Sequence, residues 1–158
     1  LRANSLSLSP ALAPAILMMM NIVYAASAYP LGKLSDRIGT FALLAGGIIA
    51  LIAADIILAF ADGLPLVFAG TALWGLHMGM TQGLLTALVA KAAPADLRGT
   101  AFGIFHLLTG AALLIASALA GWLWTAHGPA ETFIAGAVFA TVSLACFVFI
   151  RVRKFGVF

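Results

Sequence analysis

Charged side chains are scarce in this sequence. Only 8% of its 158 residues are Asp, Glu, Lys or Arg, whereas 64% are hydrophobic, and an ordinary soluble domain has roughly 25% charged residues. The mean hydropathy is +1.16. A soluble globule could not cover so much apolar surface with so few polar side chains, so we expect lipid to surround the chain. We therefore predict an integral membrane protein.

Cysteine and acidic residues are also rare, and their scarcity excludes several kinds of chemistry. Cys146 is the single cysteine, so no disulfide can form within the chain. Five acidic and eight basic residues give a net charge of +3, but the basic residues are scattered between apolar runs and do not indicate nucleic-acid binding. The sequence shows no serine, histidine and acid constellation and no metal-ligand spacing. It therefore predicts neither an enzyme nor a resident cofactor or metal.

Five apolar stretches are long enough to cross a bilayer as helices, which takes about 20 residues each. Short segments with Gly, Pro or charged residues separate them, so successive helices are expected to be antiparallel neighbours. The expected fold class is an all-α integral membrane protein with five transmembrane helices. The predicted helices cover about 10–31, 41–61, 65–90, 99–125 and 131–150.

The basic residues indicate how these helices are oriented. If the segment 32–40 is cytoplasmic, seven of the eight basic residues fall on the cytoplasmic side, with Arg2 as the exception. The positive-inside rule then predicts a multi-pass protein of the plasma (inner) membrane, with the N-terminal end outside and the C-terminus cytoplasmic. An odd number of helices and a start at Leu1 suggest a piece of a longer protein. The seven residues are Lys33, Arg37, Lys91, Arg98, Arg151, Arg153 and Lys154.

The third predicted helix carries two stripes of different character. Glycine recurs at every fourth position along one stripe, which at about 100° per residue lies nearly opposite the stripe of Trp74, His77 and Thr81. The glycine stripe predicts close contact with another helix. The polar stripe, with Gln82 at its edge, predicts a face on a cavity. The alternative is that His77 and Gln82 only form hydrogen bonds across a helix interface. The glycines are Gly75, Gly79 and Gly83.

The first predicted helix has Asn21 and Tyr24 about one turn apart near the middle of the membrane. Polar groups at that depth are costly without partners and often mark transport pathways. The two side chains are therefore candidates for a substrate cavity. A single interhelical hydrogen bond from Asn21 explains the pattern almost equally well.

Asp55 and two histidines raise further possibilities. Asp55 is the one acidic residue deep within a predicted span, which suggests a proton site, but only about 10 Å of helix separates it from Asp62. For this reason we prefer contact with interfacial water. His77 and His106 could serve as axial haem ligands, although their heights in the membrane differ by about 9 Å. A small haem- or quinone-binding membrane subunit therefore stays open as an alternative.

Two segments resemble motifs of the major facilitator superfamily (MFS) of transporters. The segment GKLSDRIGT at 32–40 resembles the family signature but departs from it at Thr40 and Phe41, where the family usually has basic residues. The segment PADLRGTAFG at 94–103 is similar to the one that leads into the eleventh helix of such transporters. The matching signature positions are Gly32, Leu34, Ser35, Asp36, Arg37 and Gly39.

The resemblance covers essentially the whole chain and implies a partial C-terminal six-helix bundle of a twelve-helix transporter. The five spans would be family helices eight to twelve, and the first, third and fourth of them would line a central cavity. The resemblance also implies a conformational latch, in which Asp36 lies against a helix N-terminus and Arg37 against an acid in one conformation only. The predicted latch residues are Gly32, Asp36, Arg37, Gly39, Arg98 and Gly99.

The function implied by the resemblance is secondary active transport of a small organic solute by alternating access, with proton-coupled efflux favoured. Uptake of a metabolite by a symporter of the same fold and the haem- or quinone-binding subunit are the alternatives. The expected partners are a small-molecule substrate, protons, the lipid bilayer and the missing N-terminal half of the transporter. Without that half, the 158 residues are not expected to transport. The predicted cavity residues are Asn21, Tyr24, Trp74, His77, Thr81 and Gln82.

Overall fold

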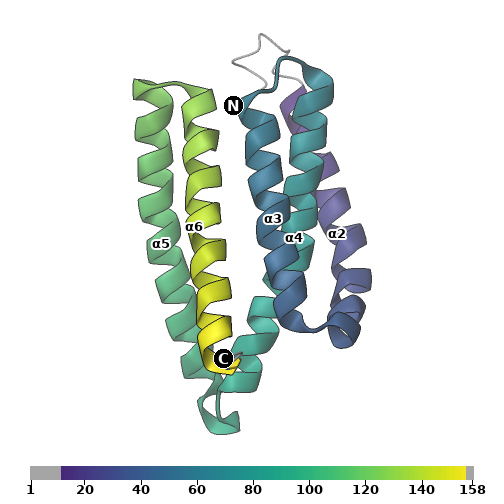
Figure 1. The fold of residues 1–158 in the computed structure, drawn as a ribbon, viewed down its shortest axis with the longest axis vertical. Helices are drawn as coiled ribbons and strands as arrows, with labels where there is room; N and C mark the ends of the chain where they lie inside the picture. Colours follow the sequence, from purple (N-terminus) through teal and green to yellow (C-terminus); the bar gives the residue numbers. More distant parts are fainter. Residues whose placement is uncertain (1–11, 156–158) are drawn as a thin grey trace.

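The computed structural model describes residues 12–155 as a bundle of five long α-helices and one short 3₁₀ turn (Figure 1). Within this part of the chain there is no β-strand. The predicted all-α membrane fold with five helices is therefore confirmed. The elements are α2 (Leu12–Ile38), α3 (Thr40–Ala59), α4 (Leu64–Ala92), η1 (Ala95–Leu97), α5 (Arg98–Ala126) and α6 (Pro129–Phe155).

Glycine and proline set the boundaries between the helices. Gly39 and Gly128 have positive φ angles of 89° and 100°, a backbone region in which glycine is strongly favoured. Gly63 precedes α4, with Pro65 in its first turn, where the missing N–H of proline costs no helical hydrogen bond. These short turns return the chain sharply, so each helix runs antiparallel to the one before it (Figure 1).

Four of the helices are long and apolar enough to cross a membrane: the segments Leu12–Ile38, Thr40–Ala59, Ala95–Ala126 and Pro129–Arg153. The remaining helix, α4, has 29 residues and would extend about 43 Å at 1.5 Å per residue, which exceeds the roughly 30 Å of a hydrocarbon core. It packs against both α2 and α3. Its polar side chains therefore have protein neighbours as well as lipid.

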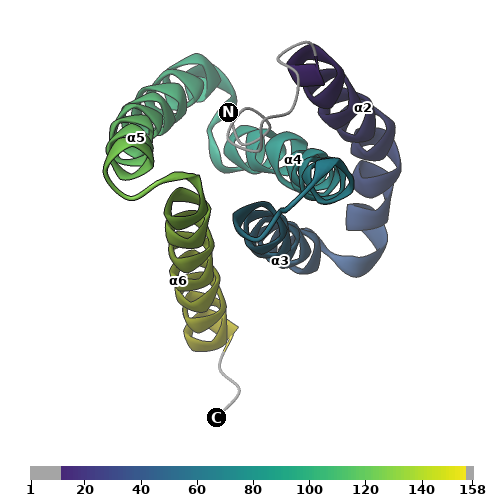
Figure 2. The same cartoon turned by 90° about the horizontal axis from the view of Figure 1, so that it is seen from above.

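Viewed along the bundle, the helices form two layers (Figure 2). One layer contains α2, α4 and α5, and the other contains α3 and α6. Helix α3 packs against both α4 and α6 and has eight buried residues, whereas α5 has none. The most enclosed part of the described structure is thus the contact of α3 with α4 and α6, and α5 is largely uncovered.

Helix α6 is also joined to α3 by aromatic side chains near its C-terminal end. The rings of Phe41 and Phe147 stack with centroids 4.5 Å apart, and the Arg151 guanidinium lies 4.3 Å from the centroid of the Phe41 ring. A cation over an aromatic ring is attracted by the negative face of the ring. These contacts hold the two helices of the second layer together.

The predicted end of the first helix at residue 31 is wrong. Helix α2 continues through most of the signature segment to Ile38, with Pro30 inside it. Hydropathy detects only the part of a helix that lies in lipid, whereas charged residues such as Lys33 and Arg37 have good helix propensity and extend it beyond that part. The predicted start of this helix at residue 10, like Arg2, lies outside the residues that the structure describes.

Candidate functional site

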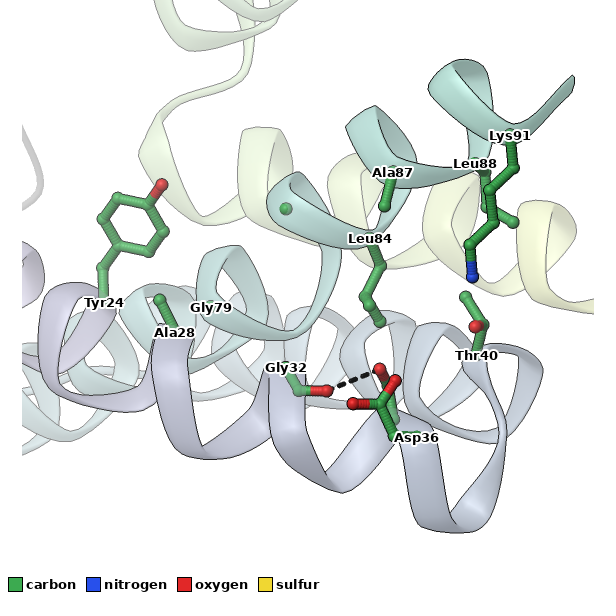
Figure 3. Close-up of a pocket in the computed structure, with 12 residues that line it drawn as sticks. Tyr24, Ala28, Gly32, Asp36, Thr40, Gly79, Leu84, Ala87, Leu88 and Lys91 are labelled. Atoms are coloured by element: carbon green, nitrogen blue, oxygen red, sulfur yellow. Dashed lines mark hydrogen bonds between the residues drawn. The ribbon is translucent and has the colours of Figure 1, made fainter. Parts of the chain in front are cut away.

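A cavity of about 350 Å³ lies between α2 and α4 (Figure 3). Tyr24 stands at one end of it, and Thr40, Asp36 and Lys91 stand at the other. The wall between the two ends is formed mostly by small residues, including Ala28, Gly32, Gly79 and Gly83. The cavity thus combines an aromatic hydroxyl at one end, a lining of small residues, and one acidic and one basic side chain at the other end.

The glycine stripe of α4 explains where this cavity begins. A Cβ atom at Gly75 would clash with the backbone carbonyl oxygen of Met20 in α2, and one at Gly79 would clash with the Ser27 hydroxyl. At Gly83 an added Cβ would meet nothing within 4 Å. The predicted close contact is confirmed at the first two glycines. Beyond Gly79 the two helices diverge, which leaves the space that forms the cavity.

His77 and Thr81 contact α3 instead of this cavity. The Nδ1 atom of His77 lies 2.8 Å from the carbonyl oxygen of Gly47, and because a carbonyl can only accept, Nδ1 is the donor of this bond. Thr81 is buried and donates its hydroxyl to the carbonyl of His77 in its own helix at 2.8 Å. Gly47 permits this approach, since a Cβ there would lie 2.6 Å from the Thr81 methyl group.

Trp74 and Gln82, the other two candidates on α4, have different surroundings. The Trp74 ring is half-buried and packs edge-on against Phe133 of α6, with ring centroids 6.5 Å apart. The Gln82 side chain is exposed. The four predicted residues of this helix therefore do not converge: two contact α3, one contacts α6, and one lies on the surface of the described bundle.

The two candidates on α2 also separate. Asn21 is exposed, and its Nδ2 donates to the carbonyl of Leu17 in its own helix at 2.8 Å. Tyr24 is half-buried and lines the cavity. Among the described residues that form the cavity wall, Tyr24 is the one that was predicted for a substrate cavity.

Two of the predicted latch residues, Gly32 and Asp36, line this cavity. The Ser35 hydroxyl donates to the Gly32 carbonyl at 2.6 Å, which fixes one wall of the cavity. Asp36 lines this cavity, whereas Arg37 lines a separate depression beside Pro30 and Lys33. Asp36 and Arg37 of the signature thus line different depressions of the surface. Arg98 and Gly99 are exposed at the start of α5.

Lys91 and Thr40 are wall residues that were not predicted. Both belong to the same end of the bundle as Asp36, because α2 ends where α3 begins and α4 returns to that level (Figure 3). The alternation of helix direction already placed Lys91 and Asp36 on one side of the membrane. The sequence did not show how far α2 and α4 diverge at that end, so Lys91 and Thr40 were not predicted to line a cavity.

Asp55 is buried between helices, with only 5% of its surface exposed. Its carboxylate faces Gly136 of α6, where an added Cβ would lie 2.7 Å from Oδ2. The preferred interpretation, a side chain in contact with interfacial water, stays a prediction. The contact with a glycine on another helix could not be read from the sequence of α3 alone.

His77 and His106 do not approach each other as a ligand pair would. His77 is engaged with Gly47 of α3, whereas His106 is exposed on α5 beside the rings of Phe102 and Phe105. No group of three or more His, Cys, Asp or Glu side chains that could hold a metal occurs in the part of the chain that the structure describes. No observation in this region favours the haem-binding alternative.

A family model and a curated relative both point to the same protein family. The model of the Major Facilitator Superfamily matches residues 1–156. An uncharacterized MFS-type transporter of Methanocaldococcus jannaschii is 36% identical over 141 residues, which are 86% of this chain and 34% of the relative. Uncharacterized proteins of Mycobacterium bovis and Mycobacterium tuberculosis are each 32% identical over 113 residues, 67% of this chain and 27% of their own length. The chain therefore spans about a third or less of these relatives.

Proposed function

Because this chain belongs to the Major Facilitator Superfamily, we propose that it is part of a secondary transporter that moves a small organic solute by alternating access. The observation that carries this proposal is the family match over nearly the whole chain. Family membership points to a transporter rather than an enzyme. It also supports a multi-pass protein in the lipid bilayer, as does the presence of four helices long and apolar enough to span it.

The packing of the helices supports the proposal that further helices of the transporter pack against this chain. Transporters of this family nest inverted three-helix repeats in each half, so that α4, α5 and α6 would form one repeat and α2 and α3 the last two helices of another. Helices α3 and α6 then correspond, and they pack together. Since α4 packs against α2 and α3, its missing counterpart would pack against α5 and α6. The uncovered α5 is the surface that this helix and the other half would cover.

The cavity supports a pathway at the end of the bundle that is predicted to be cytoplasmic. In the orientation that the positive-inside rule predicts, the end of the cavity with Asp36 and Lys91 lies toward the cytoplasm and Tyr24 lies deeper in the membrane. A solute with an apolar body and a polar end fits this distribution of groups. Exporters and uptake transporters both pass through a state that faces the cytoplasm, so proton-coupled efflux is proposed from the chemistry of the cavity, an aromatic hydroxyl among small residues, and not from its direction.

Transport by the full-length protein tests this proposal. Everted membrane vesicles that contain it are made acidic inside, and uptake of ethidium, a cationic aromatic probe, is followed by fluorescence. We expect accumulation that a protonophore abolishes, and a several-fold loss of accumulation in Tyr24→Ala with normal insertion. Movement only in the opposite direction would instead establish uptake. If a broad set of amphipathic solutes moves in neither direction, the proposal is wrong.

A further inference from the structure

Two basic residues of α2, Lys33 and Arg37, line one depression of the surface. The depression has a volume of about 230 Å³, and Pro30 and Leu34 complete its lining. All four residues belong to α2 and are exposed. Because the two basic residues are four positions apart, they lie on one face of the helix, separated by about 6 Å along its axis. The depression therefore presents two positive charges side by side.

No negative charge of the described residues balances this pair. No acidic side chain lines the depression. Asp36 lies between the two basic residues in sequence, but its side chain lines the cavity between α2 and α4 instead. Among residues 12–153, neither Lys33 nor Arg37 forms an ion pair or a side-chain hydrogen bond. Within the described bundle, both charges are thus available to an anion that is not part of it.

Three other basic residues of the predicted cytoplasmic side have neighbours of a different kind. The guanidinium of Arg151 lies 4.3 Å from the ring centroid of Phe41, and that of Arg153 lies 4.8 Å from the ring centroid of Phe149. Lys91 lines the cavity that also contains a carboxylate. The pair on α2 differs from these residues, because two cations share one depression with neither an acid nor an aromatic ring in its lining.

An exposed apolar strip continues from this pair along the same face of α2. Its members are separated by three or four positions, which places them on one side of the helix. Ile22 and Tyr29 are 60% and 79% exposed. The helix rises about 16 Å from Lys33 to Ile22, which is close to half of the roughly 30 Å of a hydrocarbon core. The face thus has the length of one lipid leaflet. It consists of Ile22, Ala26, Tyr29, Lys33 and Arg37.

We propose that this face of α2 binds an anionic phospholipid of the cytoplasmic leaflet. The lipid phosphate lies in the depression, where the guanidinium of Arg37 offers the paired donors that match phosphate oxygens and Lys33 adds a second charge. The acyl chains lie along Tyr29 and Ile22. Basic clusters at the cytoplasmic boundary of a membrane attract anionic head groups. A soluble phosphate would leave the apolar strip unused, so the strip favours the lipid.

Labelling with a photoactivatable lipid tests this site without any transport assay. Full-length transporter is placed in phosphatidylcholine vesicles that contain a small share of phosphatidylglycerol with a diazirine in its acyl chain. After irradiation, the labelled residues are mapped by mass spectrometry. We expect the segment 22–29 to be labelled several-fold more than by phosphatidylcholine with the same diazirine chain. Equal labelling by the two lipids, or no labelling because other helices cover this face, would overturn the proposal.

Paired substitutions test whether the two cations hold the lipid. In Lys33→Gln combined with Arg37→Gln, labelling by phosphatidylglycerol should fall several-fold, to the level of phosphatidylcholine. Both side chains are exposed, so the variant should elute as the parent does in size-exclusion chromatography. Arg153→Gln with Lys154→Gln removes the same charge from the end of α6 and should keep the preference. A preference that survives the α2 substitutions, or that both pairs reduce equally, would refute a site at this depression.

A soluble competitor separates a lipid site from a site for free phosphate. Glycerol phosphate carries the same phosphate chemistry without acyl chains. At a concentration equal to that of the labelled lipid, we expect it to leave labelling of the segment 22–29 unchanged, because it cannot use the strip at Ile22 and Tyr29. Loss of labelling at that concentration would show that the depression takes a soluble phosphate, and the lipid proposal would then be wrong.

Discussion

At the scale of single residues, the polar side chains of this bundle divide between those that join two helices and those that form hydrogen bonds within their own helix. The hydrogen bond from His77 to the carbonyl of Gly47 joins α4 to α3. Thr71, Thr81, Thr109 and Thr141 donate to carbonyls of their own helices. Such back-bonding satisfies hydroxyl groups in an apolar medium, so a polar side chain in a span does not by itself indicate a cavity.

Substitution of His77 shows which of its two possible roles matters. His77→Ala removes the donor to Gly47, and interhelical hydrogen bonds in membranes contribute about 0.6 kcal/mol on average. We expect a lower temperature of half-aggregation in detergent. His77→Gln keeps a donor of similar reach and should preserve most of that stability. We expect the KM for transport to stay the same in His77→Gln. A changed KM with preserved stability would mean that His77 contacts the solute, as the sequence predicted.

At the scale of the helices, close approach and divergence along one helix produce the cavity. Helix α4 touches α2 at Gly75 and Gly79 and leaves it at Gly83. The spacing of the glycines predicted the contact. It could not predict where the contact ends, because that point depends on the direction in which α2 runs beyond Pro30.

Two alanine substitutions on α4 should therefore behave differently. Gly75→Ala forces a Cβ against the backbone of α2, which cannot rotate away as a side chain could. Overpacking of this kind costs about 1–3 kcal/mol. We expect a clear loss of thermal stability in detergent. Gly83→Ala has open space around it and should remain as stable as the parent while it narrows the cavity. Equal stability of both variants would contradict the described packing.

Much of the fold could be predicted from the sequence because hydropathy reports directly on contact with lipid. All five predicted spans correspond to helices, and the misplaced end of α2 lies at the charged segment that contains Lys33 and Arg37. The site was predicted less well. Periodicity shows that His77, Thr81 and Trp74 share a side of α4, but not that this side faces α3 and α6. That rotation follows from residues on the other helices, such as Gly47 and Phe133.

At the scale of the whole molecule, the bundle has one well-packed part and one uncovered part. Helix α3 is enclosed by its neighbours, whereas α5 contributes no buried residue. The chain spans about a third of its Methanocaldococcus jannaschii relative. An uncovered helix in a partial chain is what a two-half transporter would leave when its other helices are absent. Alternating access is thus a property proposed for the full-length protein.

Access to Gly83 from the cytoplasm tests this central claim most directly. The measurement uses full-length transporter with Gly83→Cys and Cys146→Ser and without other cysteines, and an impermeant thiol reagent applied to the cytoplasmic face. We expect position 83 to react from that face, and a proton gradient to change the rate several-fold as the cavity closes and opens. A rate that stays the same with and without the gradient, in protein that still transports, would contradict alternating access through this cavity.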